Sequence, residues 1–340
     1  MVRAGFQWMF LILGTVIGAG YASGRELWQF FGHESVLAIG LFSVLFSFCC
    51  YVIMSVSYSK KSIHYRPVLE QLIGPRLSVV FDLLIILYLF STTVVMLAGG
   101  GATLHTFRIP YWIGVLFIVV LLVVLFLWDV EGMISMNAFV IPILVLLLLF
   151  VLFVFMQDHI QQFPLDFRNQ KNWPSAFTFT ALNILPLVAV LSAVGNQIRR
   201  KGEILIASIG SGLVLGGISL LYNQSLISIA NEIMLYEIPL FGILKHYPYF
   251  WVLIMSILLW IAIYTTAASG VFGIISRFRK HVQLPLWMMS ALLLIFMMPL
   301  TTFGFSTLIA VLYPIYGIVN LYILAAILLQ PFMKRSKSLQ

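Results

Sequence analysis

Runs of roughly 20 apolar residues, the length that an α-helix needs to cross a bilayer, follow one another along this chain. Short polar segments separate them. Charged residues make up only 9% of the sequence, whereas a soluble domain contains about 25%. The sequence therefore predicts an all-α integral membrane protein with little room for a separate soluble domain.

About ten runs are long enough to serve as transmembrane helices. The expected spans are 5–31, 35–58, 77–102, 110–128, 132–156, 174–198, 203–229, 248–276, 284–300 and 304–330. With this assignment of spans, most of the 19 Lys and Arg residues lie on the same side of the membrane as both chain ends. Because basic residues collect on the cytoplasmic side, we expect a multi-pass protein of a cell membrane, bacterial in type, with both termini in the cytoplasm.

The polar residues show no pattern of an enzyme. The sequence has no phosphate-binding loop, no nucleophile–base pair and no His or Cys spacing for a metal cofactor. Cys49 and Cys50 are adjacent in an apolar run and are expected to be buried, inert thiols. Because the basic residues cluster at the ends of apolar runs, the net charge of +8 calls for no nucleic-acid partner. We expect no enzymatic activity and no organic cofactor.

Three glycines interrupt the first apolar run, at Gly14, Gly18 and Gly20. Each glycine costs a helix interior roughly 0.5–1 kcal/mol relative to alanine. One interpretation is a span made of two half-helices with unwound backbone between them, which is tolerated at membrane depth only beside protein or a wet cavity. The other is that the small residues let two helices pack closely. The stretch alone leaves both open.

The sixth run contains Pro186 after two polar residues, Thr180 and Asn183. Proline removes a backbone donor and frees a carbonyl one turn earlier, so this run predicts a second broken helix, although a simple kink is the alternative. Breaks five spans apart, in helices of opposite direction, are typical of an inverted repeat. The corresponding division is a first repeat at 1–156, a second at 174–330 and a cytoplasmic tail at 331–340.

The eighth run carries small residues and hydroxyls between Ala262 and Gly270. Thr265 and Thr266 supply hard oxygen atoms of the kind that small hard cations prefer. The alternative is that each hydroxyl bonds back to a carbonyl of its own helix.

The motif G-x-x-[IV]-G-x-G at residues 14–20 and the motif A-x-x-[ST]-[ST] in the eighth run resemble the amino acid–polyamine–organocation (APC) superfamily. Within it, the segment GTVIGAGYASGRELWQFF most resembles the YkvI-like family of bacterial membrane proteins. That resemblance implies the LeuT-type fold, a five-plus-five inverted repeat with broken first and sixth helices. It also implies a sodium site. The implied ligands are the carbonyls of Gly14, Ile17 and Ala262 and the hydroxyls of Thr265 and Thr266.

The same resemblance implies where a solute binds. The amides of Gly18, Ala19 and Gly20 would hold the carboxylate of an amino acid, and Tyr88 of the third span would contact the solute. The sixth span would contribute Phe179, Thr180 and Asn183. Some proton-coupled relatives place a lysine of the fifth span at the sodium position; residues 132–156 contain no Lys or Arg, which favours sodium.

Charged residues inside spans are functional hypotheses by default. Arg25 and Glu26 are candidates for an outer gate or, alternatively, a solvated pair at the helix end. Asp82 is expected to pair with a nearby base at a helix interface. The sequence thus predicts a sodium-coupled symporter of an amino acid or similar small organic solute. The alternative is a solute-sensing receptor of the same fold, similar to spore germinant receptor subunits, without net transport.

Overall fold

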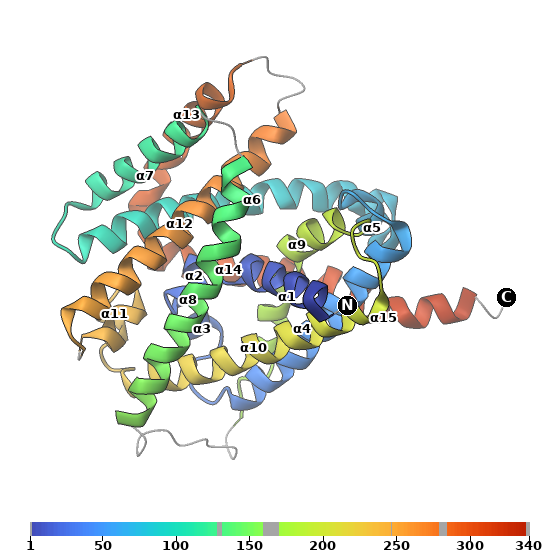
Figure 1. Cartoon of the computed structure of the whole chain (residues 1–340), viewed down its shortest axis with the longest axis horizontal. Helices are drawn as coiled ribbons and strands as arrows, with labels where there is room; N and C mark the ends of the chain where they lie inside the picture. The colour runs from blue at the N-terminus through green and yellow to red at the C-terminus, as the bar shows by residue number, and fades with distance from the viewer. Residues whose placement is uncertain (1, 128–130, 159–169, 246, 279–283, 338–340) are drawn as a thin grey trace.

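The computed structural model describes residues 2–127, 131–158, 170–245, 247–278 and 284–337, with the side chains of 131–141 and 332–337 excepted. All regular structure in these ranges is helical (Figure 1). The α-helices are α1 Val2–Val16, α2 Ala19–Ala22, α3 Arg25–Phe30, α4 Val36–Lys60, α5 Arg66–Ile73, α6 Pro75–His105, α7 Tyr111–Leu125, α8 Glu131–Asp158, α9 Ser175–Ala193, α10 Lys201–Ser228, α11 Pro239–Leu244, α12 Tyr249–Phe278, α13 Leu286–Met297, α14 Phe305–Val319 and α15 Leu321–Lys337. Two 3₁₀ helices are η2 Ile233–Leu235 and η3 Met298–Phe303.

Seven helices in the described ranges are long and apolar enough to cross a membrane, and three shorter apolar helices accompany them. The shorter ones overlap the predicted first, fourth and fifth spans. Large apolar side chains such as Val44, Leu213 and Ile295 remain exposed on the helix bundle, as expected for a surface that faces lipid. The chain is therefore a multi-pass membrane protein. The count of ten spans and the two five-helix repeats stay predictions.

The first predicted span is divided into three helices. Helix α1 ends at Val16, α2 begins at Ala19, and a second interruption at Ser23 and Gly24 precedes α3. Gly24 has φ +79°, in the left-handed region that glycine adopts most readily. The prediction of a break at the glycine-rich stretch is confirmed, but the expected second half-helix is itself split after four residues.

The predicted break in the sixth span is wrong, because α9 is one continuous helix from Ser175 to Ala193. Pro186 lies inside it. A membrane helix tolerates proline where neighbouring groups and small backbone adjustments satisfy the freed carbonyl. The side chain of Asn183 reinforces the turn before the proline by donating to the carbonyl of Phe179 at 2.8 Å. The helix therefore continues through Pro186 without a break.

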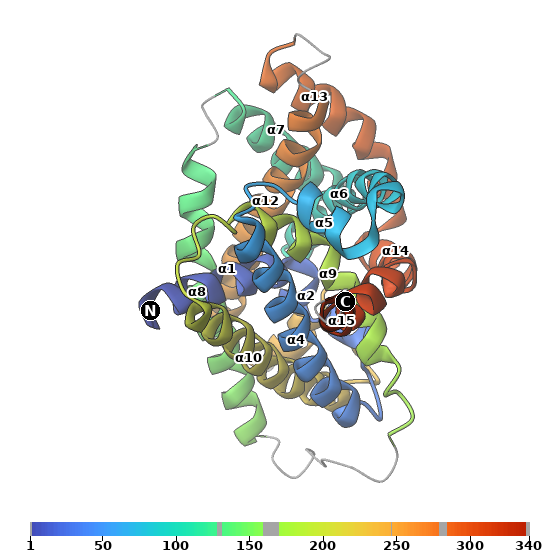
Figure 2. The same ribbon diagram turned by 90° about the vertical axis from the view of Figure 1, so that its right-hand side faces the viewer.

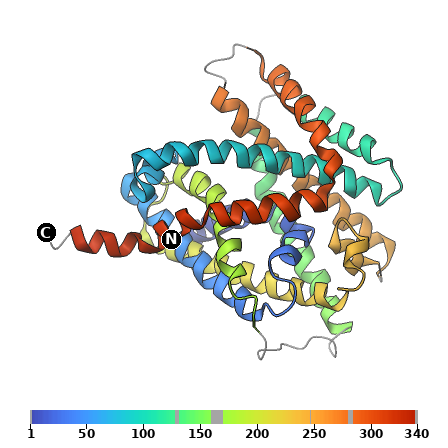
Figure 3. The ribbon, with the colours of Figure 1, turned by 180° about the vertical axis from the view of Figure 1, so that it is seen from behind.

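Two packed groups of helices surround the interrupted span. Helix α1 lies along α10, which also packs against α4 (Figures 1 and 2). On the other side α6 packs along α12, and α7 and α13 lie next to each other at the edge of the molecule. The start of α1 and the end of α15 lie at the same end of the bundle, and α11 lies at the opposite end (Figures 1 and 3). The interrupted span therefore lies between two helix pairs, α4–α10 and α6–α12.

Helix α15 runs past the predicted end of the tenth span to Lys337, so the predicted tail at 331–340 is helical over its described part. The two thiols of the chain, Cys49 and Cys50, both lie on α4 and are fully buried, as predicted. They pack within the apolar core and have no disulfide.

Candidate functional site

The main chain leaves the helical hydrogen-bond pattern at the end of α1. The N–H of Gly18 donates to the carbonyl of Val16 at 2.8 Å, instead of to the carbonyl of Gly14, its partner in a continuous helix. The described hydrogen bonds outside regular helices include none that ends on the carbonyl of Gly14 or Ile17. These are the two carbonyls predicted to bind sodium. Their release supplies the oxygen donors that such a site requires.

The eighth predicted span, now α12, faces this break. A Cβ atom built on Gly18 would lie 3.8 Å from Oγ1 of Thr266, so the two segments meet where the backbone is unwound. Ala262 and Thr265 are buried on the same helix. The structure thus brings Thr266 beside the break, although 248 residues separate it from Gly18 in the sequence.

The other two predicted ligands on α12 contact each other. The hydroxyl of Thr265 donates to the carbonyl of Ala262 at 3.2 Å, which is the back-bonding alternative. A threonine hydroxyl that donates one hydrogen bond still has lone pairs to offer. The residues present therefore fit a small hard cation as carbonyl and hydroxyl oxygens, and their role as sodium ligands stays a prediction.

Glu26 lies over the second half of the break. A Cβ atom on Gly20 would overlap Oε1 of Glu26 and lie 2.7 Å from its Cδ. Glycine at position 20 is what allows the carboxyl group to approach the backbone. Because α2 is only four residues long, it has little dipole to hold an anion, and a carboxyl group already lies beside Gly20. The predicted binding of a solute carboxylate by Gly18, Ala19 and Gly20 gains no support from this geometry.

The two charged residues of α3 do not form a pair and are not solvated. Arg25 is 9% exposed and Glu26 is 6% exposed. The guanidinium of Arg25 interacts electrostatically with Glu237, which precedes α11, while the Nε of Arg25 has no hydrogen-bond partner. The solvated-pair alternative is wrong for this structure. A gating role for Arg25 and Glu26 stays a prediction.

Tyrosines of α6 and α14 lie within electrostatic range of Glu26. Tyr88 on α6 packs edge-to-face against Tyr316 on α14, with ring centroids 5.3 Å apart. The hydroxyl of Tyr316 is 2.7 Å from that of Ser91. Both Tyr88 and Tyr313 interact electrostatically with Glu26. Tyr88, a predicted solute contact, is thus placed near the break, whereas Tyr313 and Tyr316 carried no signal in the sequence.

The predicted solute contacts of the sixth span serve the packing of α9 in this conformation. The ring of Phe179 lies 4.9 Å from that of Phe31 and 4.8 Å from that of Phe42, within a buried aromatic cluster. Thr180 donates to the carbonyl of Ala176 at 2.6 Å and is fully buried. Asn183 bonds within its own helix, as described above. Contact of these residues with a solute stays a prediction.

Helix α10 holds α2 in place through contacts that the sequence did not indicate. Tyr222 donates to the carbonyl of Ala22 at 2.9 Å, and Tyr21 lies 2.8 Å from the hydroxyl of Ser219. A buried main-chain carbonyl needs such a partner once it leaves a helix. These partners lie about 200 residues away, so no local pattern could identify them.

Asp82 pairs with a base at a helix interface, as predicted. It accepts a hydrogen bond from Arg277 at the end of α12 and another from Tyr65, which precedes α5. Burial and the neighbouring Asp82 raise the pKa of Tyr65 to about 12. Because α6 and α12 pack along each other, this network connects two neighbouring helices.

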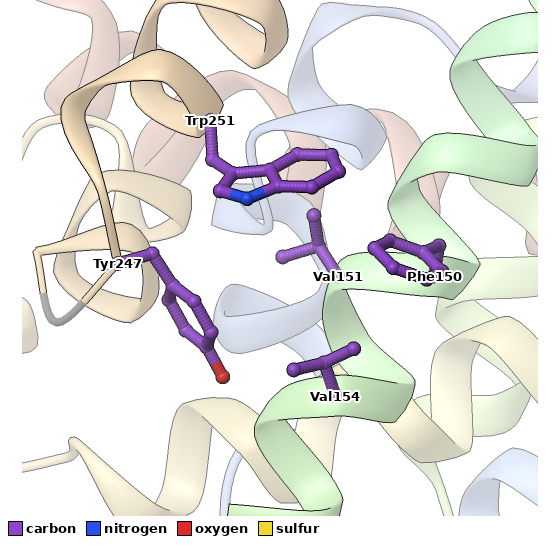
Figure 4. A pocket seen from close by; sticks show the side chains of 5 residues that line it. All are labelled: Phe150, Val151, Val154, Tyr247 and Trp251. Carbon is purple, nitrogen blue, oxygen red and sulfur yellow. The ribbon is translucent and has the colours of Figure 1, made fainter.

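A separate apolar cavity lies between α8 and α12 (Figure 4). Phe150, Val151 and Val154 line it from α8, and Tyr247 and Trp251 from the other side. It contains none of the predicted site residues. Among the described residues, no group of three or more His, Cys, Asp and Glu side chains lies close enough to hold a metal ion.

The fold is similar to that of known transporters. The inward-facing conformation of Mhp1 matches with a TM-score of 0.58 at 14% identity, over 93% of this chain and 73% of Mhp1. Mhp1 in a closed conformation with bromovinylhydantoin, described as a nucleobase-cation-symport-1 family transporter, matches with a TM-score of 0.56 at 13% identity, over 90% and 74% of the two chains. A manganese transporter of Eremococcus coleocola, in complex with an aromatic bis-isothiourea substituted compound, gives 0.56 at 14% identity, over 88% and 70%.

These similarities concern the fold alone: the chain shares the overall helical arrangement of these transporter structures, and the five-plus-five repeat stays a prediction. In sequence it is 50% identical to the protein YyaD of Bacillus subtilis (strain 168) over 335 residues, 98% of this chain and 99% of YyaD. The chain belongs to the family of YyaD. The membrane protein YkvI of the same strain is 24% identical over 349 residues, 97% of this chain and 96% of YkvI. No family model matches the chain, and membership of the APC superfamily stays a prediction.

Proposed function

We propose that this protein is a sodium-coupled secondary carrier that moves an amino acid or a similar small organic solute across a cell membrane by alternating access. The observation that carries the proposal is the meeting of Gly18 and Thr266 at a break whose carbonyls are released from the helix. Unwound backbone at membrane depth is retained where it lines a binding site. The transporter fold supports the same conclusion.

In this proposal the ion would contact the carbonyls of Gly14, Ile17 and Ala262 and the hydroxyls of Thr265 and Thr266. Such an ion joins α1 to α12, which belong to different packed groups of helices. A bound ion favours one conformation only through its difference in affinity between the two conformations. Coupling therefore follows if the break and α12 separate when the carrier changes its side of access.

The test is uptake of labelled amino acids by the full chain in proteoliposomes, with and without an inward sodium gradient. The proposal predicts accumulation that requires the gradient. Equal uptake in the two conditions would reject sodium coupling. Saturable binding without any net flux would instead support the solute-sensing receptor, which is the alternative function of the same fold.

A further inference from the structure

Glu26 is a buried acid without a basic partner. The ion pairs in the described part of the chain are Arg66–Glu70, Lys245–Glu232 and Arg277–Asp82, and none of them includes Glu26. Arg25, its neighbour in the sequence, interacts with Glu237 instead. Withdrawing a carboxylate from water without a compensating cation is costly. Burying Glu26 without a cation therefore costs folding free energy, and this cost indicates a functional role for the side chain.

The position of Glu26 indicates that function. The carboxyl group of Glu26 lies against the backbone of Gly20 at the break. A side chain at position 20 would prevent this close approach. The phenol groups of Tyr88 and Tyr313 lie within electrostatic range, and the ring of Tyr316 packs against that of Tyr88. A carboxylate beside aromatic rings is the chemistry that recognises an organic cation.

We propose that Glu26 binds the positively charged amine of the transported solute, next to the rings of Tyr88 and Tyr313. The solute class is thereby amines that are charged at neutral pH, amino acids included through their ammonium group. Uncharged heterocycles and solutes whose amine is blocked are excluded. The inference rests on the proposed function, because it requires that the solute binds at the break in the first span.

The experiment measures binding, so that it does not depend on transport. The unfolding midpoint of the purified full chain is followed at one fixed sodium concentration while butylamine, leucine, N-acetylleucine or butanol is added. A ligand that binds the folded state raises this midpoint. We expect butylamine and leucine to raise it, and N-acetylleucine and butanol to leave it unchanged, because neither of the last two carries a cationic nitrogen.

Variants then assign the effect to Glu26. Glu26→Gln should weaken the binding of butylamine and leucine by about tenfold or more, since it removes one member of a buried charge pair. Glu26→Asp, which keeps the charge on a shorter side chain, should retain part of the affinity. Glu232→Gln, at an acid outside this cluster that pairs with Lys245, should bind both amines as the unmodified chain does.

Three results would overturn the inference: no amine binds, N-acetylleucine or butanol binds as well as the amines, or Glu26→Gln binds amines with undiminished affinity. The comparison of leucine with N-acetylleucine requires no variant, so it decides the matter even if Glu26→Gln does not fold. Amine binding without flux would reject the carrier and leave this inference intact. Sodium-driven uptake of an amine-free solute would reject only the inference.

Discussion

The backbone N–H of Leu240 donates a hydrogen bond to the carbonyl of Ser23, 3.0 Å away. Leu240 belongs to α11, and Ser23 lies at the second interruption of the first span. A short buried helix thus satisfies a main-chain carbonyl of the interrupted span. This hydrogen bond therefore connects α11 directly to the interrupted span.

Removing that donor should loosen the interruption. Leu240→Pro deletes the N–H, whereas Leu240→Ala keeps it and also shortens the side chain. One hydrogen bond is worth about 1 kcal/mol net, so the proline variant should exchange the amides of residues 19–25 about fivefold faster than the alanine variant. Hydrogen–deuterium exchange of this segment is the measurement. Equal exchange in both variants would show that the contact contributes nothing.

Thr266→Ala should weaken the sodium dependence of uptake. The substitution removes the hydroxyl that faces Gly18 and leaves the backbone of α12 unchanged, so the apparent affinity for sodium should fall by about tenfold, the effect of losing one charge-assisted contact. Ser276→Ala, on an exposed turn of the same helix, is the matched control and should titrate normally. An unchanged sodium titration in Thr266→Ala would remove this residue from the site.

Gly20→Ala should destabilise the protein by about 1–3 kcal/mol, the usual cost of forcing extra volume into a packed site. The new methyl group would overlap the carboxyl of Glu26 and displace it. Gly40→Ala meets nothing within 4 Å and should be neutral or slightly stabilising. Unfolding midpoints of the two variants in detergent compare them directly. Equal midpoints would contradict the close approach of Glu26 to Gly20.

The contribution of Tyr65 to stability should depend on pH only in strongly alkaline solution. Its pKa is raised from 10.0 to about 12 in the folded protein. A raised pKa stabilises the folded state fully below pH 10, and this stabilisation is lost as the pH rises from 10 to about 12. The difference in unfolding midpoint between the unmodified chain and Tyr65→Phe should therefore be constant from neutral pH to pH 9 and shrink above pH 10. A difference that already falls between pH 7 and pH 9 would contradict this network.

The sequence predicted those features that local patterns encode. The lengths of the apolar runs predicted the membrane helices. The glycines at 14, 18 and 20 predicted the break, because low helix propensity is a local property of the sequence. It misplaced the second break, since Pro186 weakens a helix only if the surroundings leave its freed carbonyl unsatisfied. Propensity alone does not report those surroundings.

The candidate site could be predicted only in part for a similar reason. Thr266 was found through a motif, and the structure places it beside Gly18. The partners of Glu26 are separated from it by 62 residues at Tyr88 and by 287 at Tyr313, and nothing in the spacing links them. Likewise, the sequence does not indicate whether the side chain of Glu26 pairs with Arg25 or lies against Gly20.

The burial of Cys49 and Cys50 makes this chain convenient for observing alternating access. These are its two thiols, and both lie inside the core, on α4. A single cysteine introduced elsewhere would therefore be the one that water-soluble maleimides reach, without prior removal of the native pair. Labelling rates at positions on either side of the break, with and without sodium, would then report directly which side of the membrane the site is open to.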